Sequence, residues 1–190
     1  MAGNKGVIFI DNGVTGTIGW YTQNPDAVCP AGIRKVPVHA RRSFHKVPRR
    51  QAVVSVNDFE KAIRDIHAAA GLNLGDMDVV RERPMINPTR FAASMSACRT
   101  DEAESIALER IGLEWSYIDS KNWQRGCLPS SGVKGVSSST LKAESLERGL
   151  ELFGHIPEAA NAIRTHRDAD SLMGAYIVYS ERYGGRANET

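Results

Sequence analysis

The sequence predicts an α/β fold in which a mixed sheet is flanked by helices, and three observations support this class. Gly6–Ile10 is an almost wholly apolar run that ends at Asp11-Asn12-Gly13, which is typical of a buried strand that stops at a turn. A second short strand is predicted at Met77-Asp-Val-Val80, after a stretch with helical periodicity. Strands come first in the chain and later alternate with helices, which is the order of an α/β or α+β fold.

The N-terminal part is expected to be mainly extended. Residues 15–21 alternate in polarity and predict a second strand, which is joined to the first by a hairpin around residues 13–16. The basic stretch from Arg34 to Arg50 contains two prolines, so we expect a loop or irregular strand there and no long helix.

The helices are predicted from apolar spacing and from residues that begin or end a helix. Asn57 or Asp58 is the expected cap of a helix that runs through Ala70 and stops at Gly71. The later elements are expected as a strand at 77–80, a helix from Pro88 to Arg110, a strand at 114–118, a mobile loop at 126–139, and helices at 141–153 and 169–183.

Length and composition exclude several classes of protein. The 190 residues, 42% of them hydrophobic and 24% charged, predict one globular domain over residues 1–190, with a basic, loop-rich segment at about 30–52. Three widely spaced cysteines without a Cys-x-x-Cys pair fit neither a disulfide framework nor a zinc site. No apolar run is long enough for a signal peptide or a membrane span, so we expect a soluble protein without a membrane partner. The expected location is the cytoplasm of a bacterium or of a phage-infected host, and an organellar origin stays open.

The net charge of +2 hides a segregation along the chain. Between Asp26 and Asp58 there are seven cations and no acid, so this window carries +7 and the rest of the chain −5. A second acid-free window, 120–143, holds four further cations. Such windows are typical either of solvated loop faces or of a surface that binds a polyanion.

Four acidic residues stand where an element begins or ends. Asp11 and Glu82 follow the two apolar strands, and Asp168 and Asp170 lie near the start of the last helix. Taken singly, each has an ordinary explanation as a turn residue, a solvated strand end or a partner of the helix dipole. If they converge, the cluster would repel itself unless cations neutralise it, and oxygen ligands favour Mg²⁺ or Mn²⁺. Two such ions can support phosphodiester hydrolysis.

Helix geometry separates the last two acids. Asp168 and Asp170 are two positions apart, so they cannot both face one site from the middle of a helix, whereas His166 and Asp170 can. We therefore predict Asp11, Glu82 and Asp170 as metal ligands and His166 as a further catalytic candidate. Asp168 stays a catalytic candidate if the helix starts late.

Five segments, in order, resemble RuvC-type Holliday junction resolvases, most closely the phage-encoded and plant chloroplast members. The segments are Phe9-Ile-Asp-Asn-Gly-Val-Thr-Gly16, Val79-Val-Arg-Glu-Arg-Pro84, Ile118-Asp-Ser-Lys-Asn-Trp123, Lys142-Ala-Glu-Ser145 and His166-Arg-Asp-Ala-Asp-Ser-Leu172. The resemblance implies a ribonuclease H-like fold and Mg²⁺-dependent (or Mn²⁺-dependent) endonuclease action, with two ions at the site. It also implies a homodimer that acts on branched DNA such as four-way junctions, with the helix at 87–110 at the dimer interface.

Two departures from the family pattern concern the site. The usual Asp-Pro-Gly is Asp11-Asn12-Gly13 here, and a second acid three residues before Asp170 would fall on Arg167. Either His166 or Asp168 would then supply the fourth group.

A nuclease needs cations beside its carboxylates because the DNA backbone is negatively charged. By resemblance, Lys142 is expected to bind the scissile phosphate. Phe44 is a candidate for stacking or wedging at a junction because it is isolated within the basic run. The other DNA-binding candidates are Lys121, Arg41, Arg42, Lys46, Arg49 and Arg50.

Three other functions stay open at this level. A ribonuclease H-like enzyme could act on flaps or RNA–DNA hybrids. The motif Asp11-x-Gly-x-Thr15-Gly-Thr17 also resembles the phosphate-binding turn of sugar kinases and actin-like ATPases, although that fold normally needs two such domains. Because position 167 is not an acid, a DNA-binding protein without nuclease activity is the third alternative.

Overall fold

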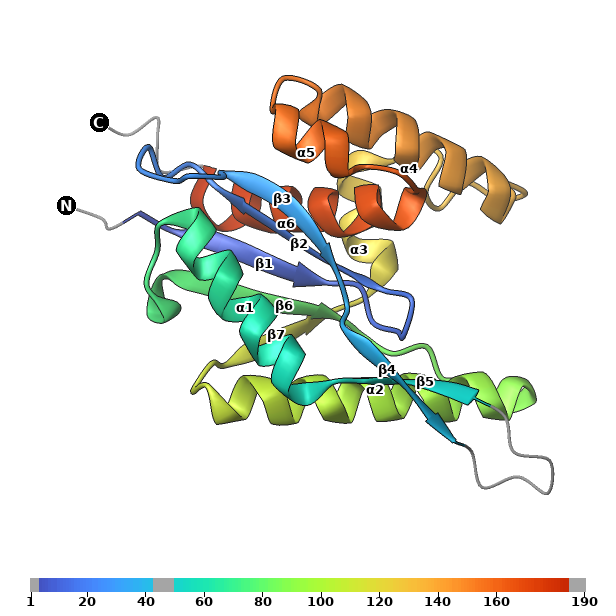
Figure 1. The fold of residues 1–190 in the computed structure, drawn as a ribbon. Helices are drawn as coiled ribbons and strands as arrows, with labels where there is room; N and C mark the ends of the chain where they lie inside the picture. The colour runs from blue at the N-terminus through green and yellow to red at the C-terminus, as the bar shows by residue number, and fades with distance from the viewer. Residues whose placement is uncertain (1–3, 43–49, 185–190) are drawn as a thin grey trace.

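The central feature of the computed structural model is a mixed five-stranded sheet (Figure 1). The structure describes residues 4–42 and 50–184. The strand order is β3-β2-β1-β6-β7, with bounds β1 Gly6–Ile10, β2 Thr17–Thr22, β3 Ala31–Lys35, β6 Met77–Glu82 and β7 Trp115–Ile118. The first three strands pair antiparallel, whereas β1, β6 and β7 run parallel. The predicted mixed sheet is therefore confirmed.

Helices cover both faces of this sheet, because β1 is apolar on both sides. Ile8 and Ile10 pack against α1 (Val56–Ala70) and α2 (Phe91–Arg110), and Val7 and Phe9 pack against the opposite group of helices. The opposite group consists of α3 (Ser120–Cys127), α4 (Ser138–Phe153), α5 (Pro157–Ala162) and α6 (His166–Tyr183), seen above the sheet in Figure 1. This arrangement is the predicted sheet between two helical layers.

Helix α6 lies unusually close to the sheet because two glycines leave room for it. A Cβ on Gly19 of β2 would collide with the backbone of Ser171, and a Cβ on Gly174 would lie 2.7 Å from the ring of Phe9. At the start of α6, the Thr17 hydroxyl donates a hydrogen bond of 2.7 Å to the carbonyl of Arg167. The first turns of α6 are therefore held beside the end of β1.

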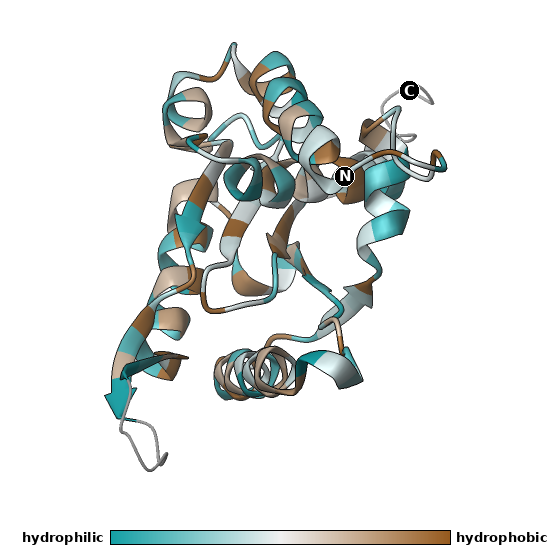
Figure 2. Cartoon of the chain, turned by 90° about the vertical axis from the view of Figure 1, so that its right-hand side faces the viewer, coloured by the Kyte–Doolittle hydropathy of each residue, from teal (hydrophilic) through white to brown (hydrophobic). Residues whose placement is uncertain are grey.

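The basic segment differs from the loop or irregular strand that the sequence predicts. Besides β3, it forms β4 (Val38–Arg42) and β5 (Arg50–Val54), which pair antiparallel with Val38 opposite Val54 and Arg42 opposite Arg50. Backbone pairing makes these strands regular although every residue of β4 is exposed. In Figures 1 and 2 the pair extends away from the main sheet as a largely hydrophilic arm.

Several helix boundaries also differ from the predictions. The cap of α1 is Ser55, earlier than Asn57 or Asp58, while Gly71 ends the helix with φ 64° as expected. Helix α4 starts at Ser138 because the Ser137 hydroxyl accepts a hydrogen bond of 3.1 Å from the amide of Thr140. Neither α3 nor α5 was predicted, and α3 takes the first residues of the expected mobile loop. Short 3₁₀ turns at Leu74–Asp76 (η1) and Pro88–Arg90 (η2) precede β6 and α2.

No helix in the described ranges combines the length and apolarity that crossing a bilayer would require.

Candidate active site

Three predicted carboxylates come together at one edge of the sheet. Asp11 directly follows β1, and Glu82 is the last residue of β6. These strands are parallel neighbours with Ile10 opposite Arg81, so Asp11 and Glu82 occupy the next matching positions. Asp170 approaches from the first turns of α6, and its charge acts on both of the other carboxyl groups. Asp11, Glu82 and Asp170 are therefore near enough for their charges to act on one another, and their convergence on a single metal site stays a prediction.

Asp11 is held by a tight turn between β1 and β2. Its amide donates a hydrogen bond of 3.0 Å to the carbonyl of Thr17, and the amide of Gly16 donates one of 2.8 Å to that of Gly13. A Cβ on Gly16 would collide with the carbonyl oxygen of Asp11, so glycine is required at that position. Burial raises the pKa of Asp11 well above its usual range, and the charges of Glu82 and Asp170 raise it further.

Glu82 faces the layer that contains α3. Burial raises its pKa, a hydrogen bond with Ser120 of α3 opposes this rise, and the charge of Asp170 adds to it. Ser120 lies in a helix that the sequence did not predict, so its contact with the candidate site was missed. The resemblance of Ile118–Trp123 to a segment of the family was the sequence signal that could have placed Ser120 near the site.

Asp170 is held by a contact between two helices. Burial raises its pKa from 3.8 to about 6, although the hydrogen bond from Ser145 and the charges of Arg167 and Lys142 lower it. The Ser145 hydroxyl of α4 donates to Oδ1 of Asp170 and is only 1% exposed. This bond fixes which way the carboxylate points.

Asp168 has a different role in the structure. Its Oδ2 accepts hydrogen bonds from the amides of Thr165 (2.7 Å) and Arg164 (3.1 Å) and from the Thr165 hydroxyl (2.9 Å). Together with the Thr165 side chain this forms a capping box, which explains why α6 begins at His166. Asp168 is buried in this cap, and its charge is not among the influences on the pKa of Asp11.

His166 and Arg167 complete the start of α6. Burial lowers the pKa of His166, and the neighbouring charges of Lys142 and Arg167 lower it further. Arg167, where the resemblance expects an acid, lowers the pKa of both Asp11 and Asp170. A cation therefore stands beside the carboxylates at this position.

The chemistry of the three carboxylates fits a hard divalent cation, but their side chains lie too far apart to hold one ion together. Asp11 and Glu82 are buried oxygen donors whose pKa values are raised by the like charge of Asp170, and Mg²⁺ or Mn²⁺ would stabilise such groups. Within residues 4–42 and 50–184, however, no three His, Cys, Asp or Glu side chains are grouped closely enough to hold an ion. Asp11, Glu82 and Asp170 thus interact through their charges without closing around one point.

A buried charge cluster lies directly behind the carboxylates and was missed by the sequence reasoning. Arg81, fully buried, donates hydrogen bonds of 2.6 Å to Oδ1 of Asp101 and 3.0 Å to Oε2 of Glu104, both on α2. Asn12, next to Asp11, donates one of 3.3 Å to the same Asp101 oxygen. The cluster therefore links both carboxylate-bearing strands to α2. The sequence signal for this cluster was the alternation of side chains along a strand, which turns Arg81 to the face of the sheet opposite Glu82.

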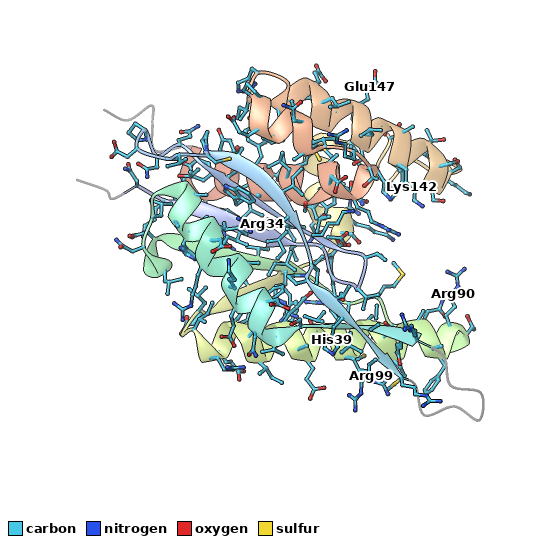
Figure 3. The ribbon with its side chains drawn as sticks, in the orientation of Figure 1. Arg34, His39, Arg90, Arg99, Lys142 and Glu147 are labelled. Carbon is cyan, nitrogen blue, oxygen red and sulfur yellow. The ribbon has the colours of Figure 1, made fainter. Side chains whose placement is uncertain are left out.

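The predicted DNA-binding residues lie on several elements around this edge. Lys121 and Lys142 are exposed at the starts of α3 and α4, and Figure 3 shows Lys142 at the same end of the molecule as Arg90, which directly precedes α2. Arg41 and Arg42 on β4 and Arg50 on β5 are exposed on the arm. Phe44, Lys46 and Arg49 lie outside the described residues.

Comparisons with known proteins bear on the fold. No family model and no curated protein matches the chain. A structure of T. thermophilus RuvC in complex with a Holliday junction substrate is similar, with a TM-score of 0.51 and 12% identity over 95% of this chain and 96% of that one. A second Thermus thermophilus RuvC structure gives a TM-score of 0.47 and 14% identity over 94% and 96%. The first likeness shows that this chain has the RuvC fold, the ribonuclease H-like α/β architecture that the sequence predicted.

Proposed function

We propose that the protein is a divalent-metal-dependent, structure-selective DNA endonuclease that cleaves four-way junctions and related branched DNA by phosphodiester hydrolysis. The observation that carries this proposal is that Asp11, Glu82 and Asp170 lie near one another at one edge of a RuvC-like sheet. Burial raises the pKa of all three, and the charge of Asp170 raises those of Asp11 and Glu82 further. Perturbed carboxylates that converge in this way are typical of functional sites.

Asp11, Glu82 and Asp170 would hold Mg²⁺ or Mn²⁺, with two ions per site as the proposed stoichiometry. When bound, the metal would neutralise the carboxylates, activate the attacking water and stabilise the leaving oxygen. The hydrogen bond from Ser145 orients Asp170, and Lys142, which is exposed, would bind the phosphate. His166 is retained as a further catalytic candidate. Asp168 is not, because its Oδ2 is committed to the helix cap.

A homodimer on branched DNA is the proposed assembly. Helix α2 presents exposed apolar side chains, among them Phe91, Met95 and Ile106, which a partner copy would cover. The likeness to phage-encoded and plant chloroplast members rests on the sequence motifs.

The test is a cleavage assay on a synthetic four-way junction with Mg²⁺, with Mn²⁺ and with a chelator. Asp11→Asn should abolish cleavage yet keep junction binding, because it removes a carboxylate without changing the shape of the turn. Asp26→Asn is the matched control, since Asp26 is exposed and lies in the loop after β2, at the opposite edge of the sheet from Asp11. Undiminished cleavage by Asp11→Asn would contradict the proposal.

A binding protein without nuclease activity is the second candidate, and two observations favour it. Arg167 stands where an acid is expected, and the described carboxylates do not close around one point. Tight junction binding with no cutting in either metal would support this candidate. Flap and RNA–DNA hybrid substrates in the same assay separate a junction resolvase from a broader ribonuclease H-like nuclease.

A further inference from the structure

A cavity of about 480 Å³ lies between the β1–β2 turn, β3 and the start of α6. Its apolar lining includes Val14, Ile33 and Val36, and its cationic lining is formed by Lys35, Arg164 and Arg167. Its volume falls within the range of about 300–1,000 Å³ that is typical of ligand sites. Apolar walls beside several cations match a ligand with one apolar and one anionic part.

The positive charge of this cavity exceeds the negative charge of its lining. Within the described part of the chain, none of the three cations Lys35, Arg164 and Arg167 forms an ion pair. The Nε of Arg164 donates a hydrogen bond to the carbonyl of Asn161, which is uncharged. Asp168 also lines the cavity, so its lining carries three cations and one carboxylate. The cavity therefore favours an anion.

The cavity adjoins the candidate active site. Arg167 lines it and also acts on the carboxyl groups of Asp11 and Asp170, whose pKa values it lowers. Gly16 lines it too, and the place of its missing Cβ is taken by the carbonyl oxygen of Asp11. The bond from Thr17 to the Arg167 carbonyl holds this wall in place. An anion in the cavity would lie next to a phosphate at the carboxylates.

We propose that this cavity binds one nucleotide of the DNA strand adjacent to the cleaved linkage. Its phosphate would contact Arg167, Lys35 and Arg164, and its sugar or base would contact the apolar wall of Val14 and Ile33. The proposal rests on the proposed nuclease function and deepens it. It gives Arg167 a substrate-binding role at the position where the family resemblance expects a metal-binding acid.

The test measures binding of a four-way junction in chelator, where no cleavage occurs, as a function of salt. Lys35→Ala, Arg164→Ala and Arg167→Ala should each weaken binding about threefold to tenfold and reduce the logarithmic salt dependence by about 0.9, the value for one lost phosphate contact. Lys5→Ala is the control. It also removes one positive charge, but Lys5 precedes β1 and Asp11 follows it, so the two residues lie at opposite ends of this strand. This variant should change neither quantity.

Modified junctions then locate the contact. A neutral methylphosphonate at the linkage next to the cleavage site should weaken binding by the wild type more than binding by Arg167→Ala, because the variant has already lost one of the three cations that contact this phosphate. Equal losses in the two proteins at every linkage would overturn the proposal.

Arg167→Asp separates the two roles of this position. We expect it to bind more weakly than Arg167→Ala, and faster cleavage than wild type would instead assign position 167 to the metal site and overturn the proposal. If the wild type cuts junctions but the three alanine variants behave like Lys5→Ala, the cavity proposal alone fails. If the wild type neither binds nor cuts branched DNA, the proposed function fails, and the cavity proposal with it.

Discussion

Replacing Asp170 with asparagine is expected to stabilise the metal-free protein while abolishing cleavage. The pKa of Asp170 rises from 3.8 to about 6, mainly through burial, so its ionised form is less favourable in the folded protein than in the unfolded chain. Each pKa unit corresponds to about 1.4 kcal/mol, so the ionised carboxylate costs about 3 kcal/mol of folding free energy. Asparagine removes the charge and keeps an oxygen that can accept the Ser145 hydrogen bond.

The sign of the pH dependence follows from the raised pKa. Between about pH 4 and pH 6 the folded protein keeps a proton that the unfolded chain has lost, so the stability of the wild type falls as the pH rises through this range. Above about pH 7 the full cost is present, and the variant should melt about 6–12 °C higher than the wild type. At pH 4 the two proteins should melt at similar temperatures.

Thermal unfolding from pH 4 to pH 8, with and without Mg²⁺, is the assay. Mg²⁺ at about 100 times its dissociation constant would stabilise the wild type by about 2.7 kcal/mol, and the variant should lose most of this gain. Asp26→Asn should leave both the pH dependence and the Mg²⁺ response unchanged. The reasoning is refuted if Asp170→Asn is no more stable than the wild type at pH 8, or if it retains the full Mg²⁺ stabilisation.

Three further predictions concern the surroundings of the site. Asp168→Ala should cost about 1–2 kcal/mol through loss of the helix cap but leave metal-dependent cleavage measurable, and loss of all activity in a folded variant would return Asp168 to the active site. Gly19→Ala should cost about 3 kcal/mol in urea unfolding because its methyl group meets the backbone of Ser171, and a neutral effect would show that α6 can shift. Burial raises the pKa of Glu104 from 4.5 to about 7 despite Arg81, so the wild type should lose about 3 kcal/mol between about pH 4.5 and pH 7 from this group. Glu104→Gln should lack that part of the slope, and an unchanged slope would contradict the assignment.

The parts of the fold that the sequence predicted are those that local pattern determines. Gly6–Ile10 is almost wholly apolar because β1 is buried along its length, and only Asp78 interrupts the apolar residues of Met77–Val80. Such runs are recognisable without tertiary information. The convergence of Asp11 and Glu82 followed because residues after neighbouring parallel strands lie at the same edge. Asp170 could be placed there from helix periodicity and from the family resemblance.

The parts that were missed depend on tertiary context or on backbone pairing. The arm of β4 and β5 has exposed side chains along β4, so hydrophobic alternation could not reveal it. Helix α3 is only eight residues long, and burial of Trp123 against Phe9, with ring centroids 5.8 Å apart, favours its packed position. The capping role of Asp168 depends on where α6 begins, which differs from the predicted start by three residues.

The two neighbours Arg81 and Glu82 show how one strand can serve stability on one face and chemistry on the other. Arg81 turns toward α2, where Asp101 and Glu104 compensate its charge in a buried cluster. Glu82 turns to the opposite face, where Asp170 adds like charge and raises its pKa. Since removing one member of a buried ion pair costs about 3–5 kcal/mol, the cluster resists displacement of β6. A carboxylate held on so fixed a strand cannot move away from the like charges beside it, so their repulsion is relieved by protonation, which the raised pKa values favour, or by the cation that the proposed function places there.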